Sequence, residues 1–192
     1  MKTKIIVALY FLFAINSIVG QENKKTSESL NIKLPSTVLI KGTSTLHDWE
    51  SSVEKTEAKL VVNNLNDVDI ETLNVNVEVL SIKSGKKLMD KLTYKALKAK
   101  EHPVITFIFK KGEIVNESTN FIDIKLMGDL TIAGVTKNVS VVTKINKLGN
   151  TIVLKGSHQL KMTDFGIKPP RALLGTIKTG DEITIEFNLK FN

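Results

Sequence analysis

Apolar and polar residues alternate strictly over residues 182–191, and this pattern restricts the fold more than any other feature of the sequence. The apolar members are Ile183, Ile185, Phe187, Leu189 and Phe191, and every residue between two of them is polar or charged. Successive side chains of a β-strand point to opposite faces of the sheet. The segment therefore predicts a strand with one apolar face and one face toward water.

The same period of two recurs along the chain and predicts seven further strands. Turn-forming residues such as Gly149 and Asn150 separate several of these segments. The eight expected strands cover residues 34–44, 48–63, 73–79, 103–115, 122–132, 138–147, 151–163 and 183–191. The sequence therefore predicts an all-β protein.

One segment, residues 84–100, has a helical period instead. Its apolar positions recur every three or four residues, at Met89, Leu92, Ala96 and Ala99. Ser84 is a suitable N-cap, and Pro103 disfavours helical backbone at the residue before it. We expect one helical insertion between the third and fourth strands.

Eight amphipathic antiparallel strands fit either a two-layer sandwich or a closed barrel. Several segments are longer than the usual five or six residues of a strand, as the tilted strands of a barrel are, and this favours the barrel. The interior of an eight-stranded barrel is either just filled by side chains or holds one small ligand. Because the inward residues are mostly Val, Ile and Leu, we expect space inside.

The N-terminal 20 residues have the features of a signal peptide. Lys2 and Lys4 precede an apolar run over residues 5–19, which is too short for a transmembrane helix, and cleavage is expected after Gly20. Residues 21–33 are predicted to be a flexible lead, and residues 34–192 one domain. The mature protein would have 172 residues and a formal charge of +5, and we expect it to be periplasmic or secreted.

The composition excludes several classes of function. The chain has no cysteine, which excludes disulfides, thiolate metal sites and a catalytic thiol. Its cations are dispersed among acidic and apolar residues, without the clustered basic and aromatic residues that nucleic-acid binding needs. We expect no nucleic-acid partner and no stable insertion into a membrane.

No catalytic or metal-binding motif is present. The three histidines, His47, His102 and His158, do not have the spacing of metal ligands. The GxSxG motif of the α/β-hydrolase class of serine hydrolases is missing. The glycines are isolated rather than grouped into a phosphate-binding loop. We therefore predict no catalytic residue, no metal and no cofactor.

Two side chains are candidates for contacts with a ligand's polar head group. The alternation from Ile152 and Leu154 continues inward to His158, where a buried imidazole needs a hydrogen-bond partner in the protein or in a ligand. Arg171 is the only arginine, and a guanidinium can bind phosphate or carboxylate through two hydrogen bonds.

Four segments resemble the YceI-like family of exported polyisoprenoid-binding proteins, and they occur in the family's order. They are residues 42–49 (GTSTLHDW), residues 89–107 with Met89-Asp90, Tyr94-Lys95-Ala96-Leu97 and His102-Pro103-Val104-Ile105-Thr106-Phe107, residues 128–137 (GDLTIAGVTK), and residues 162–167 (MTDFGI). The resemblance extends over most of the chain. It implies an extended, eight-stranded, lipocalin-like antiparallel barrel that binds an isoprenoid or another long amphiphile and is not an enzyme.

The sequence departs from the family pattern at two places. Met162-Thr163 stands where many members have an arginine before the Asp-Phe-Gly segment, and Lys-Lys-Leu-Met-Asp over residues 86–90 replaces an Arg-His-Leu-like stretch. Head-group contacts that those family residues make are therefore not expected here.

The inward-facing residues of the expected strands form the predicted lipid site. They are Val75, Val77, Val79, Phe107, Phe109, Ile124, Leu126, Leu130, Ile152, Leu154, His158, Leu160, Ile185 and Phe187. The competing hypothesis is a secreted sandwich or barrel without a cavity that acts as an interaction module. A lipid hydrolase or isomerase would need a convergent acid and base that the sequence does not reveal. Both a monomer and a homodimer are compatible with the sequence.

Overall fold

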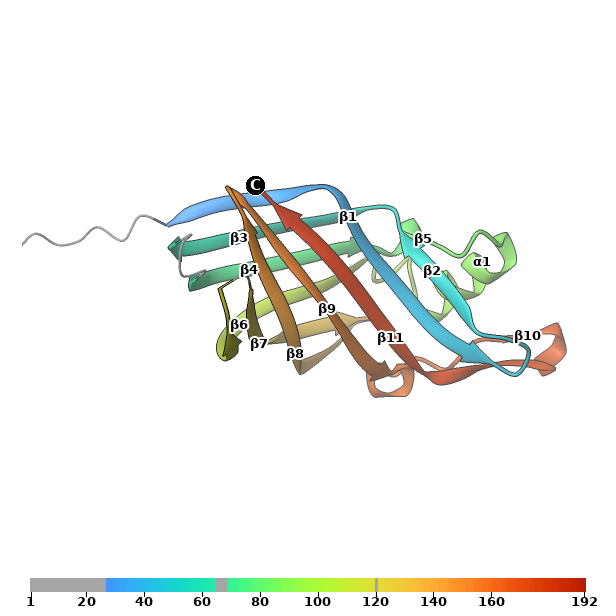
Figure 1. Ribbon diagram of the computed structural model, residues 1–192. Coiled ribbons are helices and arrows are strands. Elements are labelled where there is room, and N and C mark those ends of the chain that lie inside the picture. Colours follow the sequence, from blue (N-terminus) through green and yellow to red (C-terminus); the bar gives the residue numbers. More distant parts are fainter. Residues whose placement is uncertain (1–26, 65–68, 120) are drawn as a thin grey trace, which may run out of the picture.

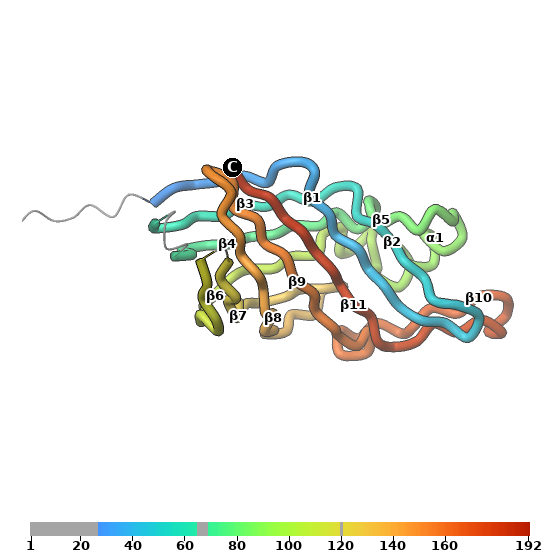
Figure 2. The backbone as a smooth tube through the Cα atoms, viewed as in Figure 1, coloured from blue at the N-terminus to red at the C-terminus, as the bar shows by residue number. Residues whose placement is uncertain are grey.

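The protein is a closed antiparallel β-barrel. The computed structural model describes residues 27–64, 69–119 and 121–192. Eight strands form the barrel in the order β1-β3-β4-β6-β7-β8-β9-β11, and β11 pairs again with β1 (Figures 1 and 2). These strands are β1 (Glu28–Ser44), β3 (Thr56–Asn64), β4 (Asp69–Glu78), β6 (Val104–Glu117), β7 (Ile122–Ile132), β8 (Val135–Leu148), β9 (Thr151–Lys161) and β11 (Ile177–Phe191). The predicted all-β fold and eight-stranded barrel are confirmed.

Pairing between β1 and β11 closes the barrel. The register runs from Ile32 opposite Phe191 to Ser44 opposite Thr179. Figure 1 shows the two strands side by side along most of their length, although they come from opposite ends of the chain. This closure decides between the two architectures that the alternation left open, because a two-layer sandwich would leave these edges unpaired.

Shorter elements extend from the barrel. They are β2 (Trp49–Val53), η1 (Val79–Ser81), β5 (Ile82–Lys83), α1 (Lys87–Ala96), η2 (Met162–Phe165), β10 (Arg171–Ala172) and η3 (Leu173–Gly175). β2 pairs with β1 on one side and with β5 on the other. The strand expected over residues 48–63 is therefore interrupted, and Glu54 and Lys55 separate its two parts, β2 and β3.

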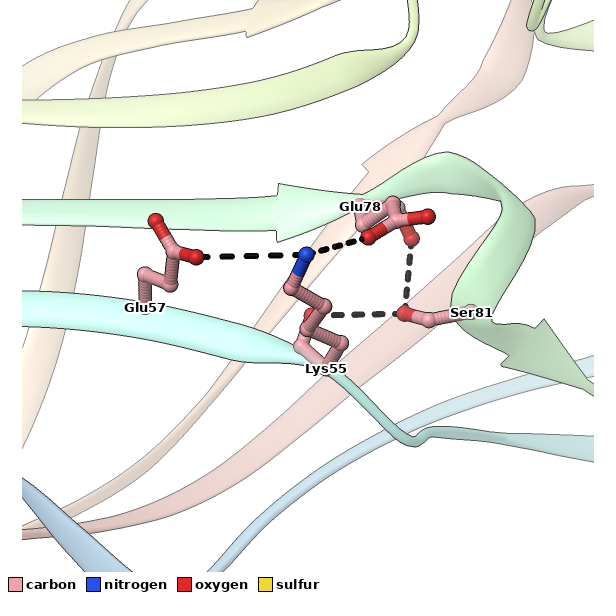
Figure 3. A network of polar contacts seen from close by, with 4 residues as sticks. All are labelled: Lys55, Glu57, Glu78 and Ser81. Atoms are coloured by element: carbon pink, nitrogen blue, oxygen red, sulfur yellow. Dashed lines mark hydrogen bonds and ion pairs between the residues drawn. The ribbon is translucent and has the colours of Figure 1, made fainter.

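A polar network holds this interruption (Figure 3). The hydroxyl of Ser81, which is buried, donates to the carbonyl oxygens of Glu78 at 2.7 Å and Lys55 at 3.2 Å. The Lys55 ammonium lies 2.8 Å from the Glu78 carboxylate and 4.0 Å from that of Glu57. The backbone N–H of Glu54 also donates to the Ser81 carbonyl. Because Ser81 of η1 makes these contacts, backbone polar groups of Glu54 and Lys55, which lie between β2 and β3, still have hydrogen-bond partners.

The helix is shorter than the predicted segment 84–100. α1 covers only Lys87–Ala96, and its N-cap is Lys86 rather than Ser84. Ser84 instead donates both its N–H and its hydroxyl to the Asp90 carboxylate, at 2.8 and 2.6 Å. The helix ends before residue 100 because Lys98 adopts left-handed backbone with φ of 51°.

The N-terminal boundary of the barrel also differs from the prediction. β1 begins at Glu28, and Leu30 pairs with Leu60 of β3 and is buried. Residues 28–33 are thus strand, so the predicted flexible lead over 21–33 is wrong at this end. This segment is a strand because its apolar side chains contact the core: Leu30 is buried in it, and Ile32 packs against it. The predicted signal peptide over 1–20, together with residues 21–26, lies outside the described residues.

Two hydrophobic clusters fill the opposite ends of the barrel. One, here called the terminal cluster, lies toward the β8–β9 turn and contains Leu60, Ile145, Ile152 and Phe191 among its buried members. The other, here called the η2 cluster, lies toward the β7–β8 turn and includes Leu130, Ile132, Leu160, Met162 and Phe165. Ala96 and Leu97, at the end of α1, pack against the η2 cluster.

Candidate ligand-binding cavity

A cavity lies inside the barrel between the two clusters. The volume within which the centre of a water molecule can move is about 140 Å³. Its wall is almost entirely apolar, and every barrel strand except β3 contributes to it.

The strand registers place the lining side chains in rows across neighbouring strands. One row runs from Val38 on β1 through Phe187 on β11 and Gly156 on β9 to Thr143 on β8. Because alternate residues of a strand share a face, the next inward residue of β9 is His158, which pairs with Ile185. The alternation seen in the sequence thus becomes a continuous inner surface.

Glycine at position 156 allows the Phe187 ring to lie against the backbone of β9. A Cβ atom built on Gly156 would lie 2.7 Å from Phe187 Cζ and 3.0 Å from the carbonyl oxygen of Val142. Any larger residue would push the ring toward the centre of the barrel. Gly156 therefore preserves open space beside Phe187.

Only two of the described lining residues have polar side-chain groups, and neither is a carboxylate, lysine or arginine. Thr143 is fully buried, and its Oγ1 has no hydrogen-bond partner. His158 is half-buried, and burial lowers the pKa of its imidazole below the ordinary value of 6.5. The cavity therefore presents neutral polar groups in an apolar wall.

Nine of the fourteen predicted lipid-site residues line the cavity. These are Val75, Val77, Phe107, Leu126, Leu130, Leu154, His158, Ile185 and Phe187. As contacts with a bound lipid they remain predictions. They meet around one space because the alternation places them on the inner face at the middle of the barrel.

The other five predicted residues do not line the cavity. Ile124 and Ile152 are buried in the terminal cluster, against which Phe109 also packs, and Leu160 is buried in the η2 cluster. Val79 is buried in η1, after β4 has ended. Inward orientation was predicted from the alternation, but position along the barrel axis was not, and these residues lie where side chains fill the interior.

Sequence reasoning missed nine residues of the wall. They are Val38, Ile40, Val53, Leu73, Ile105, Val139, Val141, Thr143 and Leu189. Most continue an alternation that was recognised on their own strand, so the signal was present. Thr143 is the exception, because a threonine on an apolar face gives no indication that it lacks a partner.

Arg171 lies away from the cavity wall. It is exposed on β10, where it pairs with Lys178 of β11. Of the two head-group candidates, His158 lines the cavity and Arg171 does not, so they do not form one site there.

The wall between β8 and β9 is paired along only part of its length. Backbone pairing extends from Thr143 opposite Gly156 to Leu148 opposite Thr151 and does not continue into residues 135–142. η2 follows β9 directly, and its Phe165 is buried in the η2 cluster, against which Val135 and Val139 of β8 also pack. The N–H and hydroxyl of Thr163 in η2 donate to the Asp181 carboxylate at 2.9 and 2.6 Å. η2 therefore covers the part of the wall where the two strands separate.

Within the described part of the chain, no group of three or more His, Cys, Asp or Glu side chains could hold a metal ion. Over the same residues, no helix is long and apolar enough to cross a membrane.

A closed, eight-stranded antiparallel barrel around one apolar cavity defines the lipocalin-like class of protein. The sequence matches the YceI-like domain family over residues 30–191, and the chain therefore belongs to that family. No curated protein matches the sequence.

Solved structures with the same fold include three from bacteria. BcnA of Burkholderia cenocepacia superposes with a TM-score of 0.67 at 22% identity, over 81% of this chain and 95% of that protein. A polyisoprenoid-binding domain from Saccharophagus degradans gives a TM-score of 0.64 at 11% identity, over 85% and 97%. The YceI protein of Campylobacter jejuni gives 0.60 at 20% identity, over 73% and 82%. At these identities the likeness supports the fold alone.

Proposed function

We propose that this protein is exported and that it binds, sequesters or carries a long-chain isoprenoid or another amphiphilic lipid inside the barrel. The observation that carries the proposal is the apolar cavity inside the barrel, whose wall includes members of both the terminal and the η2 cluster. Membership of the YceI-like family and the resemblance to a structure named as a polyisoprenoid-binding domain support it. The cavity favours this proposal over the alternative hypothesis of a cavity-less interaction module.

Transfer of the lipid tail from water provides the affinity in this proposal. Burial of each methylene contributes about 0.8 kcal/mol. Burial of a tail segment of roughly ten carbons then contributes about 8 kcal/mol before the costs of ordering and association are subtracted. A lipid longer than the cavity would bind with part of its tail outside it.

The proposed function needs no cofactor and no catalytic group. Export would follow from the apolar N-terminal segment, and a carrier role fits an exported protein because lipids need transfer through water between surfaces. The proposal includes no reaction at the lipid. The two polar residues of the wall are assigned to binding rather than to turnover.

The test is lipid extraction of the purified, folded protein, combined with native mass spectrometry. We expect an approximately stoichiometric amphiphile to be extracted and the corresponding mass to be present on the intact protein. Protein that is purified without lipid and also fails to take up a prenyl lipid from solution would overturn the proposal.

A pair of variants on β7 connects the result to the cavity. Leu126→Glu places a carboxylate in the apolar wall, and Met127→Glu makes the same change at the adjacent residue, which does not line the cavity. If both fold, as their circular dichroism and cooperative melting would show, only the first should lose lipid. Equal lipid content in the two folded variants would contradict the assigned site.

A further inference from the structure

Two adjacent leucines, Leu173 and Leu174, are exposed to water at the turn between β10 and β11. Their exposed fractions are 66% and 110%, and Leu174 is the most exposed of the large apolar residues that the structure describes. Both have left-handed backbone, with φ of 47° and 56°, a conformation that disfavours residues with a Cβ atom and that glycine adopts freely. Leucine at these positions therefore serves neither the packing of the core nor the geometry of the turn.

A third exposed leucine, Leu46, lies beside this turn. The N–H of Thr45 donates to the Lys178 carbonyl at 3.0 Å, and the Thr45 hydroxyl accepts from the Lys178 N–H at 3.2 Å. Leu46 follows Thr45 directly and is 66% exposed. Residues 45–47 and 168–178 are here called the η3 tip. The hydrogen bonds of Thr45 join its two segments.

The η3 tip is basic as well as apolar. Residues 165–180 contain three cations, Lys168, Arg171 and Lys178, and no acidic residue. All three are exposed, and within the part of the chain that the structure describes none of them forms an ion pair. Asp48, directly after the first segment, is the one acid next to the tip in sequence. Exposed leucines and unpaired cations thus occur together on a short stretch of chain.

A second basic segment, α1, lies at the same end of the barrel. Figure 1 shows α1 and β10 at one end of the molecule, away from the C-terminus. Ala96 and Leu97 attach α1 to the η2 cluster, but no residue of the helix itself is buried. Residues 84–100 contain six lysines and one acid, and Leu88 in the first turn is 61% exposed. The positive charge of this end is therefore larger than the tip alone provides.

We propose that the η3 tip, with α1 beside it, docks this end of the barrel on the surface of a membrane that contains anionic lipids. Leucine side chains at such a surface leave water for the boundary between head groups and acyl chains, and lysine and arginine are attracted by the negative surface potential. Docking of this kind needs no membrane-spanning helix. The inference goes beyond lipid binding in the cavity and does not require it, although a lipid carrier would collect or release its ligand at such a surface.

The charge of the tip favours a lipid surface over a second copy of the chain. In a symmetric dimer the same patch of both copies meets itself. Arg171 and Lys178, which lie opposite each other on β10 and β11, would then face the cations of the other copy. Juxtaposed like charges disfavour such a complex, whereas anionic lipid head groups complement them.

Vesicle co-sedimentation of the exported, purified protein tests the proposal. The vesicles are phosphatidylcholine, with or without roughly one-third phosphatidylglycerol. We expect binding to the anionic vesicles to be at least about tenfold tighter than to the neutral ones, since several cations contribute. Raising the salt concentration should weaken it, because exposed charges are screened.

Point variants connect binding to the tip. Leu174→Ser should weaken binding to anionic vesicles about tenfold, and Arg171→Gln about fivefold. Leu148→Ser is the matched control, because Leu148 is also 66% exposed but lies at the end of β8, before the β8–β9 turn. Lys33→Gln, which removes an exposed cation opposite Lys190 on β11, is the control for charge. Both controls should bind as the wild type does.

The absence of cysteine makes the orientation measurable as well. Leu174→Cys and Leu148→Cys each provide a single site for an environment-sensitive fluorophore. With anionic vesicles, the emission of the label at position 174 should shift to the blue, because the label enters a less polar environment. The emission of the label at position 148 should not change.

Four results would overturn the proposal. They are no binding to anionic vesicles, equal losses in Leu174→Ser and Leu148→Ser, equal emission shifts at the two labels, and a concentration-dependent dimer that Leu174→Ser abolishes. A lower melting temperature for Leu174→Ser would also contradict it, since the leucine would then have a structural role. Lipid extraction tests the cavity separately, so the docking surface and the proposed function can fail independently.

Discussion

Gly128 and Gly156 allow aromatic rings to lie close against the inner backbone of the barrel. A Cβ atom on Gly128 would come within 2.6 Å of the Phe107 ring, just as one on Gly156 would meet Phe187. Both phenylalanines line the cavity. Each ring therefore covers a backbone site where a side chain is missing, and the volume of the cavity depends on the small residue as much as on the large one.

The Gly156→Ala variant tests this dependence. The new methyl group would displace Phe187 and press on the Val142 carbonyl, and we expect a loss of about 1–3 kcal/mol in the free energy of unfolding, typical of overpacking. Denaturant unfolding measures it. Phe187→Leu should recover part of the loss in a double-mutant cycle, since the two residues are in contact. Strictly additive effects would show that the ring is not the source of the strain.

His158 should make the stability of the protein depend on pH below neutrality. Burial lowers the pKa of the folded imidazole, while the unfolded chain titrates near the ordinary value of 6.5. Above that value the histidine is neutral in both states and its contribution is fully present. As the pH falls through 6.5 toward the lower folded pKa, the unfolded chain binds a proton that the folded protein does not, so stability decreases.

The His158→Gln variant removes this titration. Its free energy of unfolding should fall less between pH 7 and pH 5 than that of the wild type, as measured by denaturant unfolding at several pH values. His47→Gln, in the exposed loop before β2, is the control and should follow the wild type. Parallel pH profiles for the wild type and His158→Gln would contradict the effect of burial.

At the scale of the element, η2 is held in place by one carboxylate. Asp181 on β11 accepts both the N–H and the hydroxyl of Thr163, and these hydrogen bonds are the main cause that lowers its pKa. Ionised Asp181 therefore stabilises η2 above the carboxyl's ordinary pKa, and this contribution is lost as the pH falls through the lowered folded value. η2 in turn covers the region where β8 and β9 separate.

Asp181→Asn should loosen η2 without unfolding the barrel. An amide has one acceptor oxygen where the carboxylate has two, so one of the two Thr163 hydrogen bonds is lost. Hydrogen exchange should become faster at the amides of Gly166 and Ile167, which donate to carbonyl oxygens of η2, while the strands keep their protection. Asp164→Asn makes the same charge change within η2 and should leave exchange unaltered. Equal exchange in the two variants would contradict the anchoring role.

The sequence predicted most elements because period two is a direct consequence of strand geometry. The segments 122–132 and 183–191 coincide with or lie within β7 and β11. The interruption at Glu54 and Lys55 was not predictable, since it depends on Ser81, which is distant in sequence. The start of β1 was missed for a similar reason: Leu30 and Ile32 are flanked by polar residues, and only their packing against β3 and β11 explains the strand.

The candidate site was predictable in composition but not in extent. Alternation indicates which side chains point inward, and it correctly placed Leu126 and Phe187 in the wall. It does not indicate where along the axis the interior is filled, which depends on how the two end clusters pack. The unpaired hydroxyl of Thr143 could be recognised only when its neighbours were known.

At the scale of the whole molecule, non-local pairing replaces covalent links. The chain has no cysteine, and the barrel closes through β1 and β11, with Asn31 and Asn192 exchanging two backbone hydrogen bonds at 3.2 and 3.1 Å. The terminal and η2 clusters pack the two ends, and members of both also line the cavity in the middle of the barrel. The arrangement combines a stable shell with a middle layer that is less well packed than either end.

Filling this middle layer should stabilise the protein and remove its capacity for ligand. Val141 lines the cavity, is 9% exposed, and pairs with Leu126 across the β7–β8 ladder. The Val141→Phe variant should occupy part of the open volume and raise the free energy of unfolding by about 0.5–2 kcal/mol, the usual range for cavity filling. Uptake of decanol or a prenyl lipid should decrease together with this gain.

The adjacent residue provides the matched control. Val142 is 56% exposed and faces outward, so Val142→Phe adds the same ring on the same strand without entering the barrel. Val142→Phe should not gain the stability expected for Val141→Phe, and its lipid uptake should equal that of the wild type. Denaturant unfolding measures the first quantity and native mass spectrometry the second. Only Val141→Phe should gain stability while it loses lipid binding. The physical reason is that an open cavity leaves the ligand-free protein with fewer packing contacts than a filled interior would have. If Val141→Phe instead lost stability and still bound lipid at the wild-type level, the ring would have been excluded from the interior, and the middle layer would have to be regarded as fully packed.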